Sequence, residues 1–240
     1  MAVSLPAAPV ARRTDRFFFG GMSIVILAIV FVGFMRTFYL SSYFGRPELS
    51  GLRVLHGAAF TSWVVLFAIQ TTLIAVGRRD LHRALGYGGA LLAALMIPLG
   101  FTLAIEAARA GRAPPGLAPL EFLIIPVFDM LVFAPLVAAA VYYRRQAAMH
   151  KRLMLVATLS LLGAALARVT GTPGAGGPPV FFGIPDLLIL AGVIYDRRTL
   201  GHVHPAIKWG GGFVIGSQVL RLALLKSALW MTIARAITAS

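Results

Sequence analysis

The sequence predicts an all-α, polytopic membrane protein, a bundle of seven transmembrane helices with its N-terminus in the cytoplasm. Of the 240 residues, 59% are hydrophobic and only 12% are charged, and the mean hydropathy is +0.85, a balance unlike that of soluble domains. Apolar stretches long enough to cross a bilayer recur along the whole chain. Basic residues cluster in the short segments between these stretches, as membrane topology requires.

The expected elements follow from requiring about 20 mostly apolar residues for each span. One seven-helix transmembrane domain then covers residues 17–235, behind a cytoplasmic N-terminal tail of residues 1–16. The expected helices occupy residues 17–40, 52–77, 83–107, 119–143, 151–169, 179–196 and 206–230.

Three of these helices have distinctive sequences. The first apolar run is too long for a signal-peptide core of about 7 to 15 residues, so we expect it to be retained as a helix. Pro126 and Pro135 predict a kink in the fourth helix, which neighbouring helices can tolerate in a membrane. The sixth helix is short and follows GTPGAGGPP, residues 171–179, which we expect to form a non-helical loop.

The distribution of basic residues predicts the orientation. Connections rich in Lys and Arg stay in the cytoplasm during insertion, so we expect the N-terminus inside and the C-terminus outside, in a bacterial inner membrane. The residues on the basic side are Arg12, Arg13, Arg16, Arg78, Arg79, Arg83, Arg144, Arg145, Lys151, Arg152, Arg197, Arg198 and Lys208.

The same distribution limits the expected partners. A net charge of +14 is typical of nucleic-acid-binding proteins, but here the charge lies in short clusters and not on one polar face. We therefore expect anionic lipid headgroups at the cytoplasmic face, or subunits of a membrane complex, and no nucleic acid. The chain has no cysteine, which leaves histidine and carboxylate as metal ligands.

Four of the five histidines lie on the basic side, each within a few residues of an arginine pair. Imidazole is a common ligand of transition metals and haem iron, so this set predicts a site for haem b or a transition metal. The flanking arginines favour an anionic group such as a haem propionate or a lipid phosphate. The alternative is that these are polar helix-start residues at the headgroup level. The residues are His82, His150, His202 and His204, with His56 alone on the outer side.

A second set of ionisable residues lies in the outer half of the expected bundle. Charges at such depth are costly, so they should face the bundle interior and pair, and a functional site is the default hypothesis. The structural alternative is an Asp186–Arg221 ion pair, with Asp129 protonated or hydrogen-bonded, for instance to Gln218. The set comprises Asp129, Asp186, Arg221, Arg168, Glu121 and His56.

Two segments carry a resemblance to known proteins. They are LHGAAFTSWVVLFAIQTTLIAVGRRDLHRALG and MHKRLMLVATLSLLGAALAR. They resemble a group of uncharacterised bacterial multi-pass membrane proteins that share a histidine opening one helix, an H-R-x-L-G turn and an H-[KR]-R-x-M helix start. The likeness covers about residues 53 to 210.

The pattern also distantly resembles the transmembrane cytochromes b that act as ascorbate or ferric reductases. That likeness implies His56, His82 and His150 as haem ligands. The sequence departs from the cytochrome pattern because no helix has a histidine near each end, which argues against a two-haem arrangement and leaves one haem or metal on the basic side.

The leading hypothesis is therefore an integral membrane protein that binds haem or a metal through cytoplasmic-side histidines, with a role in electron transfer or in oxidase or cofactor assembly. One alternative is a membrane binding or transport protein that uses the buried Asp, Arg and His set in the outer half. Another is an accessory subunit of a larger membrane complex.

Overall fold

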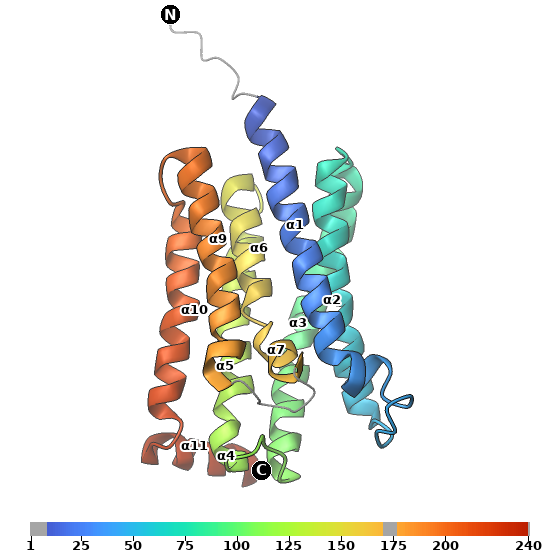
Figure 1. Ribbon diagram of the computed structural model, residues 1–240, viewed down its shortest axis with the longest axis vertical. Helices are drawn as coiled ribbons and strands as arrows, with labels where there is room; N and C mark the ends of the chain where they lie inside the picture. The colour runs from blue at the N-terminus through green and yellow to red at the C-terminus, as the bar shows by residue number, and fades with distance from the viewer. Residues whose placement is uncertain (1–8, 170–176, 240) are drawn as a thin grey trace, which may run out of the picture.

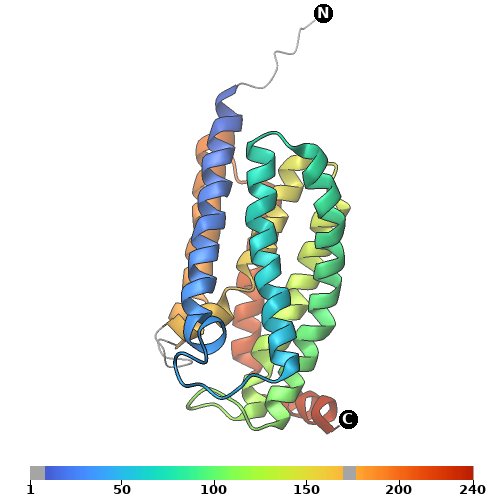
Figure 2. The same ribbon diagram turned by 90° about the vertical axis from the view of Figure 1, so that its right-hand side faces the viewer.

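The computed structural model describes residues 9–169 and 177–239, which fold as an all-helical bundle without a strand in these ranges. The long helices run side by side along one axis (Figures 1 and 2). The elements are α1 (Pro9–Phe34), the π-helix η1 (Met35–Tyr39), α2 (Gly51–Ala75), α3 (Arg79–Arg109), α4 (Pro119–Phe122), α5 (Ile124–Tyr142), α6 (Ala147–Leu159), α7 (Gly163–Val169), α8 (Gly177–Phe181), α9 (Gly183–Leu200), α10 (Pro205–Leu224) and α11 (Ala228–Ala239).

The lengths of these helices confirm the predicted general class, a helical membrane protein. Five helical segments are long and apolar enough to cross a bilayer, and the number rises to seven if each of two bent helix pairs counts as one span. Helix α1 begins at Pro9, within the predicted tail, and residues 1–8 lie outside the described part.

The basic connections gather at one end of the bundle. The start of α1 and the α2–α3, α5–α6 and α9–α10 turns all lie there (Figure 1). We call this the basic end, and the end that carries α4 and α11 the opposite end. The antiparallel helices explain this grouping, since alternate connections must return to the same side.

The core is centred on α6. Residues 155–159 of this helix are all almost inaccessible to solvent, and a helix that is apolar on every side is one that neighbours surround. Phe133 of α5 and Trp63 of α2 pack edge to face at 5.2 Å, and the Trp63 indole donates a hydrogen bond to Thr158 of α6 at 3.3 Å. The bundle therefore surrounds α6 with longer helices.

The predicted fifth span is broken. Helices α6 and α7 meet at an angle of 41° across residues 160–162, and the Ser160 hydroxyl donates back to the Ala157 carbonyl at 2.8 Å. Such a local bond offers the backbone an alternative to the helical ladder and often bends a helix. The bend places α7 against α1, where a Cβ on Gly33 would lie 2.3 Å from the Ala165 carbonyl oxygen.

The fourth and sixth spans are also interrupted. Leu123 separates α4 from α5 in the turn before Pro126, which has no N–H to donate to the Phe122 carbonyl, whereas helix α5 continues through Pro135. Of the predicted loop 171–179, residues 171–176 fall outside the described part and Gly177 to Pro179 open α8, so the end of that segment is helical.

The last predicted span is shorter than expected. The sequence predicts a helix that reaches residue 230, but α10 ends at Leu224 and α11 turns away at 92°. Helix α11 lies across the opposite end of the bundle (Figure 1). The Trp230 indole donates to the Leu120 carbonyl at 2.8 Å, and Arg109 donates to the Thr238 carbonyl at 2.9 Å, so both ends of α11 are tied to the bundle.

Candidate functional site

The structure brings two of the four basic-side histidines together. The imidazole centroids of His82, in the first turn of α3, and His150, in the first turn of α6, lie 6.2 Å apart with their planes at 85°. His202 is exposed and bonds the Leu200 carbonyl at 3.1 Å.

His204 has a capping role at the start of α10. Its Nδ1 accepts a hydrogen bond from the Ala206 amide at 3.2 Å, as an N-cap residue does. Burial, and then the positive charge of Arg152, lowers the pKa of His204, which favours the neutral ring that this bond requires. Nδ1 of His204 is therefore occupied by a hydrogen bond to the backbone.

The His82–His150 pair contains polar atoms without partners. His150 Nδ1 lies 2.8 Å from the Ala140 carbonyl oxygen; a carbonyl can only accept, so Nδ1 donates and Nε2 of the neutral ring keeps its lone pair. Gln70 Nε2 donates to the His82 backbone carbonyl at 3.1 Å. Buried His82 Nδ1 and Gln70 Oε1 have no hydrogen-bond partner. Such atoms are uncommon and call for an unseen water, ion or ligand.

A buried ion pair joins α6 to α9, and its arginine follows His150 by two residues. The guanidinium of Arg152 contacts the carboxylate of Asp196 at 2.5 Å, with the side chains 3% and 0% exposed. Asp196 Oδ2 also accepts a hydrogen bond from the His204 amide at 3.1 Å. Arg152 and Asp196 thus hold the α9–α10 turn against α6.

A second polar contact ties α1 to the same region. Asp15 accepts from Lys151 at 2.7 Å and from the hydroxyl of Tyr195. The Tyr195 ring stacks on Phe18 with centroids 4.0 Å apart. The basic end is therefore crosslinked across α1, α6 and α9.

In the outer half, the ionisable residues pair differently from the prediction. Arg221 forms its salt bridge with Asp129, at 2.7 Å, whereas Asp186 accepts from the Gln218 amide at 2.9 Å. The predicted Asp186–Arg221 pairing is therefore wrong. Counting depth along each helix puts both carboxylates at about the level of Arg221. The rotation of α5 about its axis turns Asp129 toward it.

The surroundings of Arg221 indicate a structural role. Its guanidinium also donates to the Ser217 hydroxyl at 3.1 Å and to the Ser217 carbonyl at 3.3 Å. The rings of Phe128 and Phe182 lie 5.7 and 5.2 Å from it. Three of its five N–H donors are therefore bonded within the bundle, and two aromatic rings pack against it. The carboxylate of Glu121 accepts a hydrogen bond from the Ala118 amide at 3.0 Å and caps α4.

Arg168 and His56 form a different kind of cluster at the opposite end. The guanidinium of Arg168 lies 5.1 Å from the Phe34 ring and donates to the Ala164 carbonyl, but it forms no salt bridge within the described part of the chain. It lies close enough to His56 to interact with it electrostatically. His56 Nδ1 and Thr37 Oγ1 are buried without hydrogen-bond partners.

Sequence reasoning missed several residues that organise these sites. Arg152 and Asp196 both stand inside basic clusters, where Arg152 is assigned to topology alone and Asp196 has no predicted role. Gln70 carries no charge, and only its position five residues before the end of α2 could have drawn attention to it. The signal for Asp15 was an isolated acid among arginines in the N-terminal segment.

The described residues hold no group of three or more His, Cys, Asp or Glu side chains arranged to bind a metal ion. Any metal held at the His82–His150 pair would therefore need Gln70, water or another ligand to complete its coordination. Comparison of the chain with models of protein families, with curated proteins and with solved structures finds no match.

Proposed function

We propose that this membrane protein binds a transition-metal ion between His82 and His150, at the basic end of the bundle. The observation that carries the proposal is the meeting of two imidazoles from α3 and α6 beside two buried polar atoms that lack partners, His82 Nδ1 and Gln70 Oε1. Imidazole suits zinc, copper, iron and nickel.

The hydrogen bond of His150 supports this assignment. A metal-binding histidine commonly donates its other ring N–H to a carbonyl or carboxylate, which fixes the tautomer and the ring orientation. The His150–Ala140 bond has this form. With two imidazoles and the Gln70 amide oxygen as candidate ligands, an ion would keep positions for water or substrate.

Haem iron is the alternative occupant of the same pair. We favour a single ion because the two imidazoles stand beside the Gln70 amide, a further candidate ligand. The proposed orientation has the basic end in the cytoplasm of a bacterial cell, because the arginine-rich turns gather there. A role in electron transfer or cofactor assembly rests on this proposal and needs a redox-active ion.

The test is elemental analysis combined with a visible absorption spectrum of the protein, purified without a histidine tag from cells supplied with metals and haem. We expect about one metal ion per chain. His82→Ala or His150→Ala should remove it, while the matched variant His202→Ala, in an exposed histidine at the same end, should keep it. Metal-free wild-type protein, or equal loss in all three variants, would contradict the proposal.

A second candidate function is the binding of a small anion at the opposite end, supported by the Arg168 cluster. An intramembrane arginine normally pairs with a carboxylate, and Arg168 has none among the described residues. The site adjoins the π-helix η1 and the broken α6–α7 span, and both kinds of irregularity recur at functional sites.

Thermal unfolding in detergent with phosphate, sulfate or dicarboxylates tests this second function. A bound anion should raise the unfolding temperature of the wild type and not that of Arg168→Gln. Arg46→Gln, an exposed arginine at the same end, is the control and should respond like the wild type. A panel without effect on the wild type would remove this candidate.

A further inference from the structure

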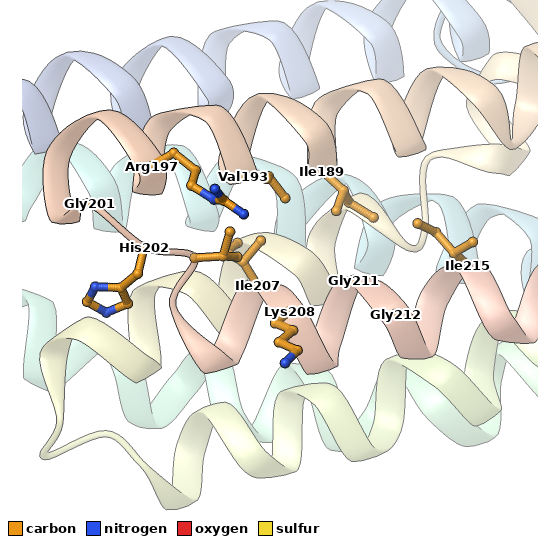
Figure 3. Close-up of a pocket in the computed structure, with 11 residues that line it drawn as sticks. Ile189, Val193, Arg197, Gly201, His202, Ile207, Lys208, Gly211, Gly212 and Ile215 are labelled. Carbon is orange, nitrogen blue, oxygen red and sulfur yellow. The ribbon is translucent and has the colours of Figure 1, made fainter.

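A groove of about 700 Å³ runs between α9 and α10, close to the turn that joins them. In Figure 3, Arg197, Gly201 and His202 lie at one end of it, and Ile189 and Ile215 at the other. The groove is separate from the histidine pair, since no residue of α3 or α6 lines it.

The floor of this groove is apolar and open. Ile189 and Val193 face it from α9, and Ile207 and Ile215 face it from α10. From residue 208 to residue 215 the helix rises about 10 Å, enough for part of an acyl chain. A Cβ added at Gly212 would meet nothing within 4 Å, so the missing side chain leaves room that the protein does not fill.

The mouth of the groove is positively charged and has no competing acid. Arg197 and Lys208 are both exposed, and no salt bridge occupies either of them among the described residues. Asp196, the neighbouring carboxylate, is turned inward and held by Arg152. Lys208 also lies 5.1 Å from the ring of Trp209, which is 71% exposed and suits the membrane interface.

We propose that this groove binds one anionic phospholipid of the bilayer leaflet that surrounds the basic end. The phosphate lies between Arg197 and Lys208, and one acyl chain lies along the isoleucines and Gly212. Basic pockets between transmembrane helices bind anionic headgroups in this way. A second protein helix would suit the glycines equally well, but it would leave both cations without a partner.

The charge requirement can be tested by native mass spectrometry of the full-length protein in detergent, titrated with phosphatidylglycerol or with phosphatidylcholine of the same chains. We expect one tightly held phosphatidylglycerol. The double variant Arg197→Gln/Lys208→Gln should weaken its binding about 30-fold, from about 1 kcal/mol for each basic residue. The matched variant Arg144→Gln/Arg145→Gln removes the same charge from the same end outside the groove and should bind normally.

The acyl-chain requirement needs a variant of its own. Gly212→Leu fills the groove and should reduce phosphatidylglycerol binding. Gly88→Leu adds the same side chain on α3, outside the groove, where a Cβ also meets nothing within 4 Å, and should leave binding intact. Because neither substitution meets a neighbouring atom at Cβ, both proteins should keep the wild-type unfolding temperature.

Several results would overturn the proposal. Equal affinity for phosphatidylcholine, or equal losses in the two charge-removing double variants, would remove the headgroup site. Displacement of the lipid by millimolar inorganic phosphate, together with normal binding by Gly212→Leu, would reduce the groove to a site for a free anion. A protein dimer that Gly212→Leu abolishes would identify a second copy as the occupant.

Discussion

At the scale of single residues, buried charges distinguish this bundle from a uniformly apolar one. Arg152 and Asp196 are 3% and 0% exposed, whereas the surface pair Arg78 and Asp80 is 56% and 64% exposed. Removing one partner of a buried pair leaves an uncompensated charge, while an exposed pair is solvated with or without its partner. The two pairs therefore form a matched comparison within one protein.

We expect Asp196→Asn to destabilise the protein by about 3 to 5 kcal/mol, because Arg152 would stay buried without a counter-charge. Asp80→Asn should be close to neutral. Replacing both members of the buried pair, as Arg152→Met/Asp196→Leu, should recover much of the loss. Thermal unfolding of the purified proteins in one detergent measures all three, and similar unfolding of the Asp196 and Asp80 variants would refute the buried role.

The corrected pairing of Arg221 makes a second prediction at this scale. Asp129→Asn removes the charge that compensates Arg221, so it should cost several kcal/mol. Asp186→Asn keeps a carbonyl oxygen that can accept from Gln218, so its effect should be small. The reverse order of unfolding temperatures would restore the Asp186–Arg221 pairing.

At the scale of elements, the last helix decides how the bundle meets its surroundings. Trp230 and Ala234 of α11 are buried against the bundle. Leu229 and Ile233 are exposed about 100° around the helix from them, and Thr232 and Arg235 lie on a third face. A helix with a protein face, an apolar face and a polar face is suited to lie in the membrane interface.

We expect Arg235→Cys and Thr232→Cys to react with a membrane-impermeant maleimide added from the side of the opposite end. Leu229→Cys and Ile233→Cys should react much more slowly, since their side chains face lipid. The native chain contains no cysteine, so the background is clean. Uniform protection of all four positions would mean that α11 is embedded, as the end of a broken span.

At the scale of the whole molecule, the basic end and α11 lie at opposite poles (Figure 1). Arginine-rich turns stay in the cytoplasm, so the chain should expose its C-terminus on the other side. A reporter active only in the periplasm should work when fused after residue 239 and fail when inserted at residues 144–146. The opposite result would reverse the orientation proposed for the metal site and the lipid groove.

The sequence by itself identified a membrane protein and the approximate position of its apolar segments. Partition into a bilayer depends on sums over about 20 neighbouring residues, so no tertiary contact is needed to recognise it. It also named His82 and His150 among the candidate ligands, because histidines at helix starts on one side of a membrane share a depth.

Only the tertiary structure decided which of those groups meet. Contact depends on the order of the helices and on their rotation about their axes. Position along the chain predicts how deep a residue lies in the membrane, but neither of these two properties. Rotation turns Asp129 toward Arg221 and leaves Asp186 to Gln218, and helix order sets His82 beside His150 while His204 caps α10. The 92° turn into α11 likewise accompanies the packing of Trp230 on the bundle. Hydropathy alone predicts a continuous span over the same residues.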